Sequence, residues 1–72
     1  LKTNEKDLHI MIEKELMRLP VLKRTIMDLY LLEQMTAEEI APVKGISLSE
    51  VEAIIKEVLS HLKKKLSFLM QT

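Results

Sequence analysis

Side chains that could bind a metal or catalyse a reaction are few and widely spaced in this chain. Cysteine is absent, and the two histidines, His9 and His61, lie near opposite ends, so no zinc-type ligand spacing occurs. The adjacent Glu38 and Glu39 favour a helix start over a catalytic dyad. No nucleophile pairs with a base, and there is no glycine-rich phosphate loop. We therefore expect no metal, no cofactor and no enzymatic activity.

The composition predicts a single all-α domain. The chain has 72 residues, of which 47% are hydrophobic and 31% charged, and 11 basic residues balance 11 acidic ones. It holds only one Gly, two Pro, one Tyr and one Phe, whereas Leu, Ile, Met, Glu and Lys dominate. No apolar run approaches the roughly 18 residues of a membrane span. Because the chain begins with Leu1, we expect it to be a fragment of a longer protein.

Apolar residues at steps of three and four predict a compact four-helix domain, with helices at about residues 5–18, 20–33, 37–44 and 48–70. Asn4 is the expected N-cap of the first helix, and Pro20 the first residue of the second. The expected buried stripes of these two helices are Leu8, Met11, Ile12, Leu16 and Leu19, then Leu22, Ile26, Leu29, Tyr30 and Leu32.

Two capping signals follow one another closely in the second half of the chain. Thr36 and Glu39 form a capping box that starts the third helix. Gly45 ends that helix in a left-handed conformation, and Pro42 is expected to bend or shorten it. Ser47 and Glu50 then form a second capping box, which starts the fourth helix.

Two capped helices joined by a glycine turn predict a helix-turn-helix. Ala41 is small where two helix backbones approach, Ile46 plugs the turn, and Val51 and Ile54 are expected to face the third helix. The alternative for this spacing is an ordinary helical hairpin.

From Leu8 to Leu66 the chain resembles the C-terminal, fourth conserved region of bacterial sigma factors, most closely the extracytoplasmic-function type. The residues that carry the resemblance are Leu19 and Pro20, Arg24, the stretch 28–33, the stretch 36–41, the turn 45–47, Val51 and Leu62. The resemblance implies a cytoplasmic helix-turn-helix domain that recognises the −35 promoter element in transcription initiation. It also implies double-stranded promoter DNA and the β flap of RNA polymerase core as partners, with an anti-sigma factor as a further one.

The resemblance places the fourth helix in the major groove of DNA. The expected DNA-binding residues are Thr36, Lys44, Ser47, Leu48, Ser49, Glu52, Ala53 and Lys56. Thr36, Lys44 and Lys56 are expected to hold phosphates, and Glu52 could accept a hydrogen bond from cytosine N4.

The charge and glycine content of this region depart from the family pattern. Residues 48–59 hold three Glu and one Lys, and Glu52 and Glu57 are expected to repel phosphates. Gln34 stands where family members commonly have glycine before the third helix. The departures bear on DNA affinity more than on the fold.

Two alternative functions remain open at the level of sequence. One is a helix-turn-helix-derived protein-interaction module with weak or no DNA binding. It is motivated by the acidic fourth helix and by a leucine seam that would form a weak dimer through residues 55–69. The other is the DNA-binding domain of a LuxR-type response regulator, which the Leu19, Pro20 and 30–33 features fit less well. Lys63, Lys64 and Lys65 are interpreted as a solvated helix face in preference to a phosphate contact.

Overall fold

The computed structural model describes the backbone of residues 5–70 and the side chains of residues 6–67. Four helices make up this part of the chain: α1 (Glu5–Met17), α2 (Val21–Leu31), α3 (Ala37–Lys44) and α4 (Leu48–Met70). The predicted all-α, four-helix architecture is confirmed, and the bounds of α3 and α4 agree with those expected. The N-cap prediction for Asn4 lies outside the described residues.

The ends of the first two helices lie within one or two residues of the approximate positions predicted. α1 stops at Met17 because the chain tightens into a turn in which the Leu19 N–H donates to the Leu16 carbonyl (3.1 Å). Pro20 precedes α2 rather than opening it: its ψ of 154° is extended, and its carbonyl accepts from the Arg24 N–H (2.9 Å). Pro20 is therefore the N-cap residue, immediately before the first residue of α2.

α2 ends at Leu31, not at residue 33, because the backbone turns left-handed soon afterwards. Gln34 has a φ of 58°, the one positive φ among the described non-glycine residues. Most side chains avoid this conformation because the Cβ atom comes close to a carbonyl oxygen. Members of the family that the chain resembles commonly have glycine at this position, and the positive φ is the physical reason.

The capping box predicted at the start of α3 is present in both directions. The Thr36 N–H donates to Glu39 Oε1 (2.8 Å), and the Glu39 N–H donates to Thr36 Oγ1 (3.2 Å). Pro42 lies inside α3 without an N–H to donate, yet the helix continues to Lys44. Pro42 was expected to bend or shorten the helix, and the shortening is not observed.

The core of the described residues draws on all four helices. α2 contributes Ile26 and Met27, both fully buried, whereas two residues expected in its buried stripe, Leu22 and Leu32, are 42% and 64% exposed. Leu22 lies in the first turn of α2 and Leu32 just beyond its last residue, and the stripe did not include the buried Met27. The remaining buried residues are Leu16, Ile40, Ala41, Val51, Ile55, Val58 and Leu62.

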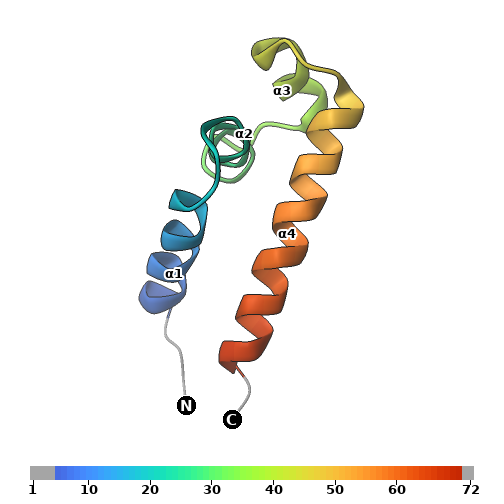
Figure 1. The fold of residues 1–72 in the computed structure, drawn as a ribbon. Helices are drawn as coiled ribbons and strands as arrows, with labels where there is room; N and C mark the ends of the chain where they lie inside the picture. The colour runs from blue at the N-terminus through green and yellow to red at the C-terminus, as the bar shows by residue number, and fades with distance from the viewer. Residues whose placement is uncertain (1–4, 71–72) are drawn as a thin grey trace.

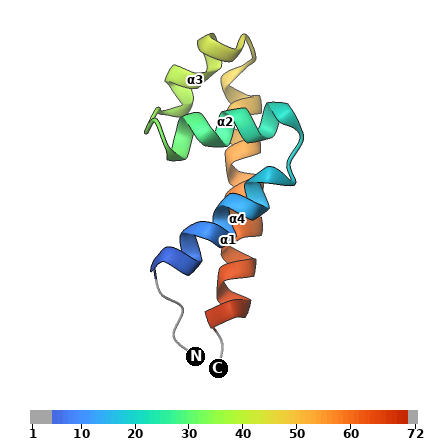
Figure 2. The same ribbon diagram turned by 90° about the vertical axis from the view of Figure 1, so that its left-hand side faces the viewer.

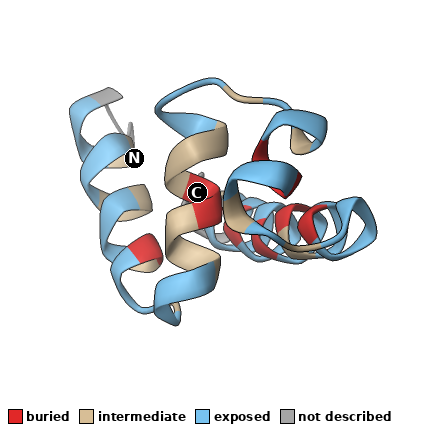
Figure 3. Cartoon of the chain, turned by 90° about the horizontal axis from the view of Figure 1, so that it is seen from above, coloured by how far each residue is buried: buried red, intermediate tan, exposed pale blue. Residues whose placement is uncertain are grey.

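α4 is the axis on which the other helices pack. The molecule measures 42 × 19 × 18 Å, and a helix of 23 residues, about 34 Å long, accounts for most of the long dimension. Figures 1 and 2 show α3 beside the N-terminal end of α4, α2 lying across it, and α1 beside its C-terminal half. Seen from above, the buried positions cluster where α2, α3 and α4 meet (Figure 3).

A cluster around one carboxylate links α1 to α4. Glu15 of α1 lies 3.1 Å from Nε2 of His61 and 4.0 Å from Nζ of Lys65, both on α4, and Arg18 is 3.9 Å away. The hydrogen bond to His61 lowers the pKa of Glu15 below its usual 4.5; partial burial opposes this, and Lys65 and Arg18 add to it. The ionised form of Glu15 therefore favours the docked position of α1.

Replacing Gln34 by glycine is expected to stabilise the fold. Gln34→Gly removes the left-handed strain at a φ of 58° and should raise the free energy of unfolding by about 1 kcal/mol. Urea denaturation measures the change. As a matched control, Glu33→Gly next to it, where φ is not positive, should lower stability by roughly 0.5 kcal/mol. A loss of stability in both variants would contradict the strain.

Replacing Glu15 is expected to remove one part of the acid sensitivity. Because the folded-state pKa is lowered, the stabilisation is complete above 4.5 and is lost as the pH falls through the folded-state value. Glu15→Gln should be less stable than the wild type at neutral pH and converge with it in acid. Melting temperatures followed by circular dichroism across pH measure this. Glu33→Gln, which removes an exposed carboxylate without an ion pair among the described residues, is the control, and parallel profiles for wild type and Glu15→Gln would refute the idea.

Candidate nucleic-acid interface

The reversal between α3 and α4 is built from backbone hydrogen bonds around Gly45. Gly45 takes the predicted left-handed conformation (φ 68°, ψ 32°), and its N–H donates to the carbonyl of Ala41. The N–H of Ile46 reaches the same carbonyl at 3.2 Å. Ser47 then caps α4, because its Oγ accepts from the Glu50 N–H at 3.1 Å. These bonds fix the direction in which α4 leaves the turn.

Packing beneath the turn holds α3 and α4 together as a helix-turn-helix. Ile40 and Val51 are fully buried and Ala41 is 8% exposed, which is consistent with a small residue at the contact between the two helices. Ile46 packs against this core from the turn, as does Ile54 from the next turn of α4. One side of α4 is therefore buried against the rest of the domain, and the opposite side is available to bind a partner molecule.

The residues predicted to bind DNA lie on that available side or around the turn. Seven of them are exposed: Thr36, Ser47, Leu48, Ser49, Glu52, Ala53 and Lys56. Lys44, in the last turn of α3, is half-buried. None of the eight is hidden beneath another part of the described chain.

Two carboxylates near this surface are already engaged within the molecule. Glu57 was expected to repel phosphates, but its carboxylate accepts a hydrogen bond from Nζ of Lys23 on α2 at 2.7 Å. Glu39 is engaged in the capping box. The exposed carboxylates of Glu38, Glu50 and Glu52 have no ion pair among the described residues. The negative charge that faces outward from α4 is thus smaller than residue counting predicts.

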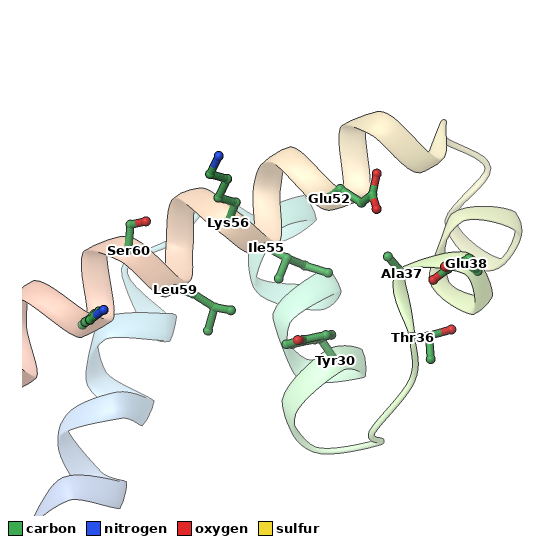
Figure 4. A pocket seen from close by; sticks show the side chains of 10 residues that line it. Tyr30, Thr36, Ala37, Glu38, Glu52, Ile55, Lys56, Leu59 and Ser60 are labelled. Carbon is green, nitrogen blue, oxygen red and sulfur yellow. The ribbon is translucent and has the colours of Figure 1, made fainter.

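A groove of about 580 Å³ runs between the start of α3 and the outer side of α4. It brings together three of the predicted contact residues, Thr36, Glu52 and Lys56 (Figure 4). Its apolar floor includes Tyr30 of α2 and Ile55 and Leu59 of α4, which point toward one another, whereas Lys56 points away from Tyr30 (Figure 4). The other five predicted residues, Lys44, Ser47, Leu48, Ser49 and Ala53, do not line this groove.

Lys63 and Ser60 also line the groove, together with Ala37 and Glu38, although none of these was predicted to belong to the site. The signal that could have placed Lys63 is its spacing of seven from Lys56, which puts both on one side of a helix. The acidic and basic residues of the groove balance, with Glu38 and Glu52 opposite in sign to Lys56 and Lys63. Because these charges cancel, the groove is not a purely basic pocket for anions. DNA binding here must come from individual contacts at specific side chains.

Other kinds of site find no support in the part of the chain that the structure describes. No group of three His, Cys, Asp or Glu side chains is close enough to hold a metal ion. None of the described helices is long and apolar enough to cross a membrane.

Comparison with known protein families finds a family model that covers this helix-turn-helix. Residues 16–64, more than half of the chain, match the family model described as Sigma-70, region 4. The matched range contains α2, α3, the turn and most of α4. No curated protein and no solved structure matches the chain.

Proposed function

The chain belongs to the sigma-70 region 4 family, the helix-turn-helix domains that recognise the −35 promoter element in transcription initiation, and on this premise we propose which of its residues do so. Domains of this family bind promoter DNA and RNA polymerase. In our proposal the N-terminal half of α4 enters the major groove of the −35 element. The protein is of the extracytoplasmic-function type, which the features of residues 19–41 favour, and it acts in the cytoplasm.

The observation that carries this proposal is the division of α4 into two sides. Val51, Ile55 and Val58 are buried against α2 and α3, while Ser49, Glu52 and Lys56 are exposed on the opposite side. A major groove about 12 Å wide admits one α-helix, so the exposed side can reach the base edges while the buried side keeps the domain folded.

The residues around the turn serve to position α4 on the phosphate backbone. Ser47 already accepts a hydrogen bond from Glu50, and its hydroxyl proton remains able to donate to a phosphate oxygen. Lys44 and Lys56 supply positive charge on either side of the turn. Thr36 lies at the N-terminus of α3, where the helix dipole favours an anion, although its own N–H is taken by Glu39.

We propose that three residues contact the bases, because their side-chain chemistry indicates most clearly which base each would meet: Glu52, Leu48 and Ala53. A carboxylate on the exposed side of α4 accepts hydrogen bonds, and among the bases cytosine offers the N4 donor in the major groove. Leu48, 39% exposed, and Ala53 present apolar surface, which suits contact with a thymine methyl group. This chemistry favours a recognition site that combines a cytosine with neighbouring thymines.

A second candidate function is supported by a neighbouring groove, which shares Leu59 and Lys63 with the first. Leu59 is 37% exposed, and a second, mostly apolar groove is lined by Ile12, Leu31, Leu59, Leu62, Lys63, Leu66 and Ser67. We include here the protein-interaction alternative, with a weak dimer through residues 55–69, part of which lies outside the described side chains. Sedimentation of the chain separates the two functions, because a stable dimer without DNA binding would favour the alternative.

The exposed apolar residues of α1 and α2 are the surface that we propose for the polymerase β flap and for an anti-sigma factor. Met17, Val21 and Leu32 are each more than 60% exposed. An exposed group of large apolar side chains is typical of a surface that another protein covers. This surface is separate from the outer side of α4, so polymerase and DNA can bind together.

The central experiment is a titration of promoter fragments with the chain at several salt concentrations. Binding at about 50 mM salt that weakens steeply by about 200 mM is expected, because phosphate contacts release counterions. Fluorescence anisotropy of a labelled fragment carrying the −35 region measures it. Absence of salt-dependent binding at low salt would remove the DNA-binding proposal.

Removing the charge of Glu52 is expected to strengthen binding but relax its sequence preference. Glu52→Gln deletes a negative charge near the phosphates, so affinity for mixed-sequence duplex should rise, while discrimination for cytosine should fall roughly tenfold or more. Selection from a randomised duplex pool, followed by sequencing, measures both. Glu50→Gln, an exposed carboxylate in the first turn of α4 that does not line the groove, is the control. Identical preferences in wild type and Glu52→Gln would exclude Glu52 as a base reader.

A further inference from the structure

The three consecutive lysines in the C-terminal half of α4, Lys63, Lys64 and Lys65, have three different surroundings. Lys65 lies 4.0 Å from Glu15 and belongs to the cluster that links α1 to α4. Lys63 lines the groove that contains Thr36, Glu52 and Lys56. Lys64 is exposed and lines neither of the two grooves. A charge run that looks uniform in the sequence is therefore divided by the fold among separate surfaces.

Lys63 is in addition available for a partner outside the molecule. It has no ion pair among the described residues, and its side chain lies on the ridge between the two grooves, since it lines both. The stem of a lysine can rest on apolar surface while the ammonium reaches outward. Leu59 and Leu62 provide such surface at this place.

The position of Lys63 along α4 suits a contact with the edge of the DNA groove. At 1.5 Å per residue, Lys63 lies about 10 Å beyond Lys56 and about 16 Å beyond Glu52 along the helix axis. The major groove is about 12 Å wide, so a helix that reads bases at Glu52 has left the groove at Lys63. At Lys63 the helix therefore lies beside the sugar–phosphate backbone of the DNA.

We propose that Lys63 binds a backbone phosphate of duplex DNA and extends the DNA interface two turns beyond Lys56. The proposal rests on the DNA-binding function proposed above. It explains how a domain whose recognition segment, residues 48–59, has more Glu than Lys can still hold DNA. The positive charge is supplied by the same helix farther along, on the side that the groove already defines.

The test compares three single substitutions in the chain, with a labelled duplex of randomised sequence as the probe. Lys63→Gln removes the charge in the groove, Lys64→Gln removes the same charge next to it, and Lys63→Arg keeps the charge. Binding is measured by anisotropy from about 50 to 200 mM salt. Melting curves by circular dichroism confirm that each variant remains folded, which is expected because both lysines are exposed.

Lys63→Gln should weaken binding several-fold and reduce the slope of log affinity against log salt by about 0.9, the value for one phosphate contact. Lys64→Gln and Lys63→Arg should leave the slope at the wild-type value. Equal effects of Lys63→Gln and Lys64→Gln, or no effect of Lys63→Gln, would overturn the inference while leaving DNA binding intact. Failure of the wild type to bind both this duplex and a fragment carrying the −35 region at about 50 mM salt would instead overturn the proposed function.

Discussion

The structure depends above all on the reversal of the backbone at Gly45. Between two helices that each need a capped end, the chain has three residues in which to turn, and a left-handed φ of 68° makes this turn feasible. The carbonyl of Ala41 accepts hydrogen bonds from the N–H groups of both Gly45 and Ile46. With the backbone satisfied, Ile40 and Val51 come together in the core, and the direction of α4 follows from their packing.

Features set by local rules were predictable from sequence, and features set by packing were not. The capping box at Thr36, the turn at Gly45 and the bounds of α3 and α4 depend on neighbours within a few residues. By contrast, Met27 is buried and Leu22 exposed because of the way α2 lies across α4, which a periodic pattern cannot convey.

The candidate site shows the same division between what neighbours decide and what distant segments decide. The exposure of Glu52 and Lys56 follows from their positions opposite the apolar stripe of α4, and it was predicted. The pairing of Glu57 with Lys23 joins residues 34 positions apart, so nothing local indicates it. The same holds for the contact of Lys65 with Glu15. Charge counted along a sequence therefore overstates what this surface presents to a ligand.

The two-sided character of α4 also bears on how such a domain can change its target. Among the residues that the structure describes, nine form the buried core, and four of them, Val51, Ile55, Val58 and Leu62, come from this one helix, where exposed positions lie between them. Substitutions at the exposed positions of α4 would therefore change its outward surface without altering the core residues on its buried side. An insertion or deletion of a single residue in α4 would instead rotate both sides at once, and lineages of such domains should diverge by replacement and hardly ever by a change of length in this helix.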